Sequence, residues 1–510
     1  MSIKSYELKG REKIEFGISL ETFMQNPINY TMFLLPKCLA IFKRNKLDYD
    51  KIEKYVVGEQ DIIHKKRPNE DVNINNIVVE NHLWRQVNFK TSFIVGNPID
   101  YSSTMAETYA DKKSDLTYLN KYDKDASRSS KDIEKYMDCF MYGHAYRMVM
   151  PKNVDFDKEN EAPYDLYNLS VYNTFCVYES GAKHRKLFSC IITNPLIIND
   201  LNSVNIKTTS LYTIYLNNSY FELEEGSVSG EPYILKTPLT IQPFKTNPII
   251  EYKLNKFSIG IPELVMYLQD GLNALSSLQF DDIEEFVNSY IVFKNVEIDE
   301  DFLSEFETNK KKRVIAVQTS DPNRPAEVDL LKESLNHADL QTIYERIINA
   351  MYDIVACPRA SGNVTSGGDT GAARLLGNGW ETAQNQAQID TTYFIQFEYE
   401  ELKSKLEVCY LKDTNIKEIH ASDIDIKYNI NMSDNLLIKA EALKMLNDIQ
   451  FPKEASLNIV KLTNDSHGIA EDWQKNVDTF NENEKETQQA NNLDIQENNF
   501  NDITSEEKTN

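Results

Sequence analysis

Apolar residues recur every three to four positions through much of the second half of the chain. Leucines and aromatics spaced in this way predict a long helix over residues 262–288, and isoleucines and a methionine predict a second helix over 336–356, which Pro358 ends. A third, very long helix is expected from near Thr370 to about Tyr410. Gly377 and Gly379 would lie inside it and favour a kink, since interior glycines weaken a helix.

The first half of the chain has a different pattern. Short helices are expected at 48–57, ended by Gly58, and at 131–141, and the stretch 76–101 mixes helix and strand signals before a turn at Gly96. Runs rich in Tyr, Val, Ile and Thr predict strands, and they lie at 143–150, 175–178, 211–216 and 246–252. Residues 1–260 are therefore expected to form a mixed α/β region, and the whole chain an α+β fold.

Three further segments separate or follow the long helices. Residues 289–335 begin with an extended apolar run and contain the basic run 310–313, followed by a strand at 314–317. Residues 358–370 have three glycines and no apolar periodicity, which predicts a flexible loop. After the third helix come a strand at 422–430, an amphipathic helix at 434–448 with Asp434 as candidate N-cap, and a further helix from about Pro452. The chain beyond Asn481 is expected to be disordered.

The formal net charge of −24 restricts the functions that the chain can have. A protein that grips nucleic acid through phosphate contacts needs a basic binding face, so this charge argues against tight DNA binding. It does not argue against DNA that passes without being held. Residues 466–510 contain 11 acidic and 3 basic side chains, so the last segment supplies a third of the net charge.

Cysteine usage and hydropathy indicate a soluble protein made in a cytoplasm. The six cysteines are scattered without a CxxC pair, which favours buried thiols in a reducing compartment. The N-terminus has no apolar leader. The most apolar run, 32–42, is interrupted by Pro36 and Lys37 and is shorter than the roughly 20 residues that span a bilayer.

The motifs of the common enzyme classes are absent from the sequence. There is no GxxxxGK[ST] loop, and the similar stretch 367–374 lacks the lysine that binds phosphate. The histidines are isolated, and neither the His144–Cys139 nor the His184–Cys190 spacing is completed by a second ligand pair. Asp281, Asp282, Glu284 and Glu285 could serve a two-metal nuclease, but a solvated helix face is the favoured interpretation. No cofactor or metal is expected.

The order of elements, together with four local stretches, resembles the portal proteins of tailed bacteriophages of the siphophage type, as found in phages of Gram-positive bacteria. The stretches are 76–101 (NIVVENHLWRQVNFKTSFIVGNPIDY), 248–256 (PIIEYKLNK) followed by 268–273 (LQDGLN), 276–286 (SSLQFDDIEEF) leading into 290–293 (YIVF), and the helix–loop–helix of 336–376. The resemblance covers about residues 20 to 465.

This resemblance implies a portal fold and a function without catalysis. The subdomains would be an α/β wing (1–260) joined by the long kinked helix (371–410), a stem of two helices (261–288 and 336–357), a small β-containing clip (289–335), a tunnel loop (358–370), a helical crown (411–465) and an acidic, largely disordered tail (466–510). About twelve copies would form a ring at one capsid vertex. DNA would pass through this ring during packaging and ejection.

The resemblance also implies partners and contact residues. The expected partners are further copies of the chain, double-stranded DNA, the terminase large subunit, a head–tail adaptor, and the major capsid and scaffolding proteins, with no membrane. The DNA-facing loop residues would be Arg359, Ser361, Gly362, Asn363, Thr365, Ser366 and Gly367, which form a polar collar. The clip residues that contact the motor or adaptor would be Lys310, Lys311, Lys312 and Arg313.

Simpler interpretations of the same residues remain open. The glycine-rich loop could be a plain linker between helices, and the basic run a solvated charge cluster beside a strand. At the level of the whole chain, the alternatives are another structural adaptor of the head–tail or tail region, a metal-dependent nuclease, or a packaging ATPase.

Overall fold

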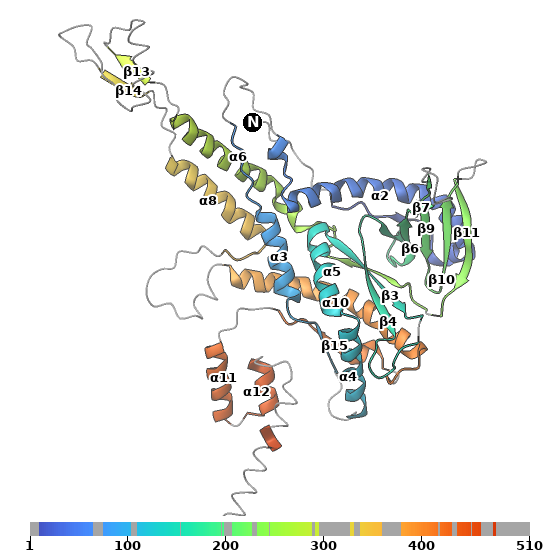
Figure 1. Cartoon of the computed structure of the whole chain (residues 1–510). Coiled ribbons are helices and arrows are strands. Elements are labelled where there is room, and N and C mark those ends of the chain that lie inside the picture. Colours follow the sequence, from blue (N-terminus) through green and yellow to red (C-terminus); the bar gives the residue numbers. More distant parts are fainter. Residues whose placement is uncertain are drawn as a thin grey trace, which may run out of the picture. The chain divides into compact units, whose positions relative to one another are not determined.

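A computed structural model describes residues 10–64, 75–103, 110–153, 155–194, 196–197, 207–226, 232–243, 245–287, 291–294, 327–330, 337–359, 379–416, 419–430, 436–449, 451–460 and 473–475 (Figure 1). The fold is α+β, as expected. The chain divides into two compact units, one of Met1–Val364 with Leu376–Asn431 and one of Thr365–Leu375 with Met432–Asn510.

The longest elements of the first unit are helices. They are α1 (Leu20–Gln25), α2 (Pro27–Val57), α3 (His82–Val95), α4 (Ala110–Asp125), α5 (Arg128–Tyr142), α6 (Ile261–Val287), α8 (His337–Ile354) and α10 (Trp380–Leu411). Two 3₁₀ turns, η1 (Asp61–His64) and η2 (Ala421–Asp423), complete the set. Helices α6 and α8 begin and end within two residues of the bounds that the apolar spacing predicts.

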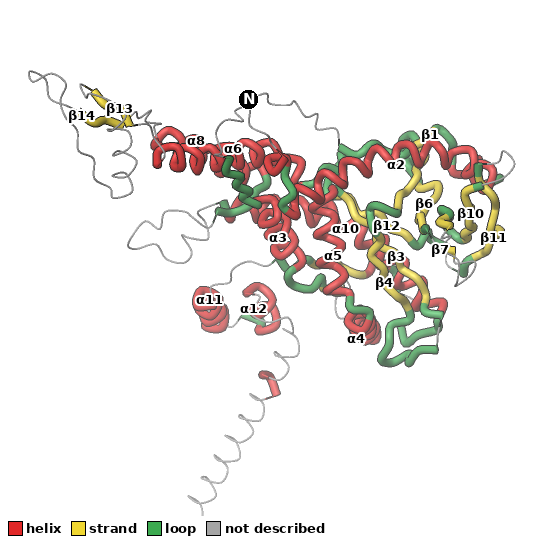
Figure 2. The backbone as a smooth tube through the Cα atoms, turned by 45° about the horizontal axis from the view of Figure 1, so that its top comes forward, coloured by secondary structure: helices red, strands yellow, loops and turns green. Residues whose placement is uncertain are grey.

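The strands form one large sheet and several small ones (Figure 2). The six-stranded sheet has the order β1-β5-β6-β9-β10-β11, with β1 (Glu15–Phe16), β5 (Thr174–Glu179), β6 (Lys186–Thr193), β9 (Leu211–Tyr215), β10 (Ser219–Glu225) and β11 (Tyr233–Ile241). The three-stranded sheet has the order β12-β3-β4, with β12 (Ile249–Lys253), β3 (His144–Pro151) and β4 (Tyr164–Leu169). The two-stranded pairs are β2 (Asp100–Ser103) with β15 (Ile424–Lys427), β7 (Leu196–Ile197) with β8 (Lys207–Thr208), and β13 (Ile291–Lys294) with β14 (Glu327–Leu330).

Helix α2 extends through both hydrophobic cores of the first unit. Its N-terminal half packs on the six-stranded sheet, where Phe42 contacts Phe175 with ring centroids 5.1 Å apart. Its C-terminal half belongs to the second core, in which Tyr49, Ile52 and Tyr55 are buried. The expected helix at 48–57 was therefore too short at its start. Its end at Gly58 is confirmed, since Gly58 has a φ of 101° and caps the helix.

The second core is built around the three-stranded sheet, which helices α5 and α10 contact. Within it, eight charged side chains that are at most 6% exposed form one cluster. Four are cations and four are anions: Arg128, Lys135, Arg147 and Lys405, and Asp123, Asp132, Glu398 and Glu401. The cluster is therefore neutral overall, and it links α4, α5, β3 and α10. We call it the buried charge cluster.

The geometry of the buried charge cluster pairs every charge with at least one opposite charge. The Lys135 Nζ lies 2.7 Å from Glu398 Oε1 and 3.1 Å from Asp132 Oδ1, and the Lys405 Nζ lies 2.9 Å from Glu401 Oε1. The Tyr252 hydroxyl adds a 2.6 Å hydrogen bond to Glu401 Oε2. Burial is the largest single influence and raises the pKa of Glu398, but the charges of Lys135, Arg128 and Lys405 together outweigh it and lower that pKa to about 2.

The second unit contains α11 (Leu436–Asp448) and α12 (Lys453–Val460), which contact each other. Both helices confirm the expected segments, whereas the candidate cap Asp434 lies outside the described residues. The same holds for the strand at 314–317, the tail after Asn481 and Gly377.

All six cysteines are free and buried, as their spacing predicts. None of the helices in the described residues is long and apolar enough to cross a bilayer.

Candidate functional site: the α6–α8 helix pair and the base of its loop

Helices α6 and α8 pack against each other closely, and a glycine lies at the interface. A Cβ at Gly271 would be 4.0 Å from Ile347 Cδ1, an ordinary van der Waals distance, so Gly271 faces α8 across the interface. Both helices are acidic, and α6 is the more acidic of the two. Helix α6 contains six acidic residues and neither lysine nor arginine over 27 residues, although most of its positions are apolar.

A stripe of polar side chains on α6 binds an extended segment, residues 75–81, which we call the strap. The Asp281 Oδ1 accepts a 2.7 Å hydrogen bond from the Asn76 amide N–H, Ser277 Oγ accepts from Val78 N–H at 3.0 Å, and Asn273 Oδ1 accepts from Glu80 N–H at 3.0 Å. The Gln269 Nε2 then donates to the Glu80 carbonyl. We call Gln269, Asn273, Ser277 and Asp281 the ladder.

The ladder can form because the rise of four helical residues is close to that of two extended residues. Four residues of α-helix rise about 6.0 Å, and two residues of extended chain rise about 6.6 Å. Ladder residues four apart can therefore reach alternate amide groups of the strap over a short distance. The strap runs antiparallel to α6, since residue numbers increase along the strap as the numbers of their partners on the ladder decrease.

Glu80 joins both helices to the end of the strap. Its carboxylate accepts hydrogen bonds from Ser276 on α6 and from Tyr344 on α8, the latter at 2.6 Å, and lies 3.2 Å from His82 Nε2. These hydrogen bonds, of which that from His82 has the largest effect, outweigh burial and lower the pKa of Glu80 to about 2. Glu80 is thus a charged link between α6 and α8.

The start of α6 is held rigidly against the body of the first unit. Side chains at Gly143 and Gly260 would collide with the backbones of Ser258 and Met141, so the two backbones pack directly together. Gly143 also has a φ of 82°, which L side chains rarely adopt. The Gly260 N–H donates to Glu263 Oε2 at 2.8 Å and so caps the first turn.

The segment between α8 and α10 begins and ends at neighbouring points. A Cβ at Gly379 would lie 3.8 Å from Pro358 Cα, although the two residues are far apart in the sequence. Trp380 follows and packs on Phe89 and Phe93 of α3, with ring centroids 5.9 and 6.1 Å apart. The expectation that Gly379 lies inside a helix is wrong: it has a φ of 83° and forms the N-cap of α10.

The structure describes one residue of the expected DNA-facing loop. Arg359 lies just after α8, and its Nη1 donates a hydrogen bond to Asn349 Oδ1. Ser361, Gly362, Asn363, Thr365, Ser366 and Gly367 lie outside the described residues, as do the start of the third helix near Thr370 and the basic residues Lys310, Lys311, Lys312 and Arg313. Their roles stay predictions.

The acidic run on α6 is only partly the solvated face that its sequence favours. Asp281 is 2% exposed and binds the strap, and Glu284 accepts a 2.8 Å hydrogen bond from the Asn76 amide. Asp281 is therefore not solvated as expected, and it has a structural role. The described part of the chain contains no group of three or more His, Cys, Asp or Glu residues placed to hold a metal ion.

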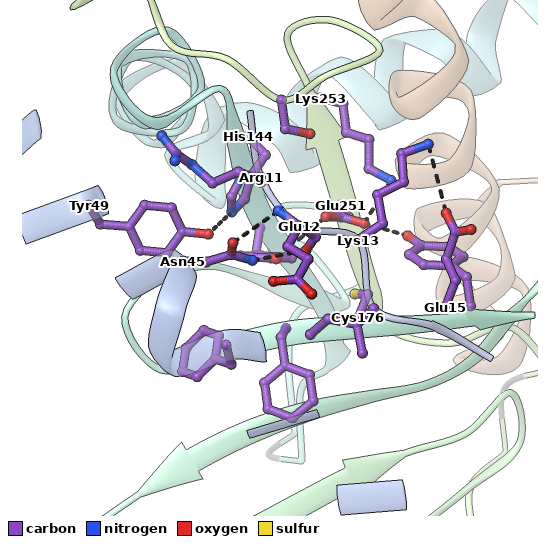
Figure 3. A pocket seen from close by; sticks show the side chains of 16 residues that line it. Arg11, Glu12, Lys13, Glu15, Asn45, Tyr49, His144, Cys176, Glu251 and Lys253 are labelled. Carbon is purple, nitrogen blue, oxygen red and sulfur yellow. Dashed lines mark hydrogen bonds and ion pairs between the residues drawn. The ribbon is translucent and has the colours of Figure 1, made fainter. Parts of the chain in front are cut away.

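A polar cavity of about 40 Å³ lies elsewhere in the first unit and is lined in part by residues 11–15 (Figure 3). The Tyr49 hydroxyl and His144 Nε2 meet there at 3.0 Å, and Asn45 hydrogen-bonds the Glu12 main chain. Burial lowers the pKa of His144 to about 4. A cavity of this size has room for water molecules. His144 therefore belongs to the packing of the body, and the described residues around it form no metal-binding group.

The sequence interpretation missed the strap, the ladder and Glu80. A signal was present, because Gln269, Asn273, Ser277 and Asp281 recur every four residues along an apolar helix, and one face of a helix is defined by this spacing. The pattern indicates a polar stripe. It does not indicate which segment binds there.

Comparison with known protein families identifies the class. A family model described as "Phage portal protein, SPP1 Gp6-like" matches residues 35–506. The chain therefore belongs to the SPP1 Gp6-like family of phage portal proteins, structural components of the virion that form the portal for DNA packaging and ejection at a capsid vertex. No curated protein matches the chain. Membership confirms the expected function without catalysis, and it does not favour the nuclease and ATPase alternatives.

Proposed function

We propose that α6 and α8 form the stem of the portal and that residues 358–370 form a tunnel loop facing the DNA. The observation that supports this most directly is the pairing of an acidic α6, free of lysine and arginine, with a segment between α8 and α10 whose flanking residues, Pro358 and Gly379, lie side by side. An acidic wall repels phosphates, so DNA can slide along it without being held.

The remaining subdomains follow the same proposal. Residues 1–260 with residues 371–410, which contain most of α10, form the wing. Residues 289–335 form the clip, residues 411–465 the crown, and residues 466–510 an acidic tail. The antiparallel pairing of β13 with β14 supports a small β element in the clip, and the packing of α11 against α12 supports a helical crown.

The portal family implies a ring and interactions with DNA and terminase. We propose a ring of about twelve copies that binds the terminase large subunit, a head–tail adaptor, and the major capsid and scaffolding proteins, in a phage of a Gram-positive host. Lys310, Lys311, Lys312 and Arg313 are proposed to contact the motor or the adaptor. Reversing these four charges should weaken docking of one of them while rings still form, and unchanged docking of both would remove this role.

The DNA-facing collar is proposed to consist of Arg359 and the loop residues Ser361, Gly362, Asn363, Thr365, Ser366 and Gly367. Small polar side chains and glycines can shift as DNA advances, because they leave the backbone few constraints. Arg359 is the single fixed cation of the collar.

The test combines Arg359→Ala with a shortening of 361–367. Both variants should assemble into rings, since Pro358 and Gly379, which flank the segment, lie side by side. Packaged DNA should nevertheless leak from filled heads. Arg185→Ala, which removes an arginine on the six-stranded sheet, serves as the charge-matched control. Normal packaging and retention of DNA in both collar variants would overturn the proposed role of the loop.

A further inference from the structure

Two guanidinium groups lie against neighbouring positions of α8 at the base of the 358–370 segment. Arg85, in the first turn of α3, is exposed, and its Cζ lies 5.4 Å from the centroid of the Tyr352 ring. Arg359 hydrogen-bonds to Asn349. Asn349 and Tyr352 are three residues apart on α8, and such positions have their Cβ atoms about 5–6 Å from each other. The two cations are therefore anchored on neighbouring parts of one helix.

These two arginines differ from most others in their charge balance. Arg11, Arg44, Arg128, Arg147 and Arg185 each form an ion pair with a carboxylate. In the part of the chain that the structure describes, neither Arg85 nor Arg359 has such a pair; their partners are a neutral ring and a neutral amide. Their positive charge is thus not neutralised by the described residues of the subunit.

The electrostatics of Tyr352 agree with this arrangement. Burial raises the pKa of the Tyr352 hydroxyl, while the charges of Arg85 and then of Arg359 act in the opposite direction. Both guanidinium groups are therefore close enough to influence the same phenol.

We propose that Arg85 and Arg359 form a phosphate-binding pair whose ligand is the backbone phosphate of the passing DNA duplex. Guanidinium groups match phosphate oxygens in geometry and remain charged at any working pH. The acidic α6 opposes this attraction, so binding stays weak. This inference rests on the proposed function, and it adds Arg85, which belongs to α3 and not to the loop.

The experiment measures binding of a short DNA duplex to assembled rings as a function of salt. The slope of log K against log salt is negative, and Arg85→Gln and Arg359→Gln should each reduce its magnitude by roughly 0.9 for every duplex phosphate that the variant ring no longer neutralises. The double variant should show both reductions together. Arg44→Gln, which removes another exposed arginine, on α2, should leave the slope unchanged.

The possible outcomes separate this inference from the proposed function. Rings that form normally but keep the wild-type slope in the double variant overturn the phosphate pair alone, as does a wild-type ring with no measurable binding at low salt. A wild-type chain that never forms rings overturns the proposed function itself. Inorganic phosphate is tested against chloride at equal ionic strength. Competition by phosphate that disappears in the double variant supports the pair, whereas competition without any change in the DNA slope shows that free phosphate, not DNA, is the ligand.

Discussion

The body of the first unit and the α6–α8 pair both bury polar groups, but they do so with different chemistry. The buried charge cluster joins α4, α5, β3 and α10 through full charges in a region almost closed to water. The ladder joins the strap to α6 mainly through neutral amide and hydroxyl groups that bind main-chain atoms. One arrangement depends on eight side chains together, and the other is a series of separate hydrogen bonds.

This difference predicts a difference in cooperativity. A buried ion that loses its partner destabilises a fold strongly, because the remaining charge cannot be solvated. Removing a neutral hydrogen bond costs less and affects mainly its own neighbourhood. The body of the first unit should therefore unfold as one block, while the strap can detach from α6 in steps.

The largest effect is expected for Arg147→Met in the buried charge cluster. Arg147 is fully buried and pairs with Asp132 and Glu401. Its removal should lower the free energy of unfolding by about 3–5 kcal/mol, measured by denaturant titration. The control is Arg44→Met, which removes an exposed ion pair with Glu12 and should change the free energy of unfolding little. Equal losses in both variants would contradict the comparison.

The next effect is expected for Asn273→Leu in the ladder. This change leaves the Glu80 amide and the Gln60 side chain without their partner. The cost should be about 1–3 kcal/mol. Hydrogen exchange should become faster at the strap amides while exchange in α5 and α10 stays the same. A uniform increase across the first unit would show that the two regions are not separate.

Acid should weaken both regions, and it sharpens the comparison. The pKa of Glu398 and that of Glu80 are both lowered to about 2 in the folded chain, from an ordinary value of 4.5. Their stabilising effect is fully present above pH 4.5 and is lost as the pH falls from there toward about 2. Glu80→Gln should flatten this acid dependence for the strap amides only. If it also flattens the pH dependence of the free energy of global unfolding, the strap is coupled to the body.

The last effect is expected at Asp138 of α5, where the dependence on pH has the opposite sign. Burial, with the nearby Glu134 and Glu53, raises its pKa to about 7. A raised carboxyl pKa favours the protonated folded state, so stability falls as the pH rises from the ordinary 3.8 through about 7. Asp138→Asn should therefore stabilise the chain at about pH 8, with no gain at about pH 4. A gain that does not depend on pH would contradict the assignment.

Element positions were predictable where one helix face is continuous. The isoleucines and methionine of α8 repeat without a break, so its bounds follow from the sequence. Helix α2 was underestimated, because Pro36 and the polar run after Phe42 interrupt the apolar pattern, yet the helix continues through them between two cores. Tertiary burial on both sides, which periodicity does not record, stabilises its whole length.

The site was less predictable than the fold. Arg359 could be proposed from its place after α8, but Arg85 could not, since its approach to Tyr352 depends on how α3 packs against α8. The ladder has the same origin, as Asn273 and Glu80 are 193 residues apart. Interactions of this kind arise from the tertiary fold, and a single sequence contains no local pattern for them.

The meeting of Pro358 and Gly379 has a consequence for how such proteins can change over evolution. A loop whose two ends are fixed side by side can gain or lose residues without moving the helices that flank it, and each doubling of its length costs only about 0.6 kcal/mol in closure entropy. Under the proposed role of residues 358–370, insertion or deletion in this segment alone would narrow or widen the bore of the ring and leave the rest of the subunit unchanged.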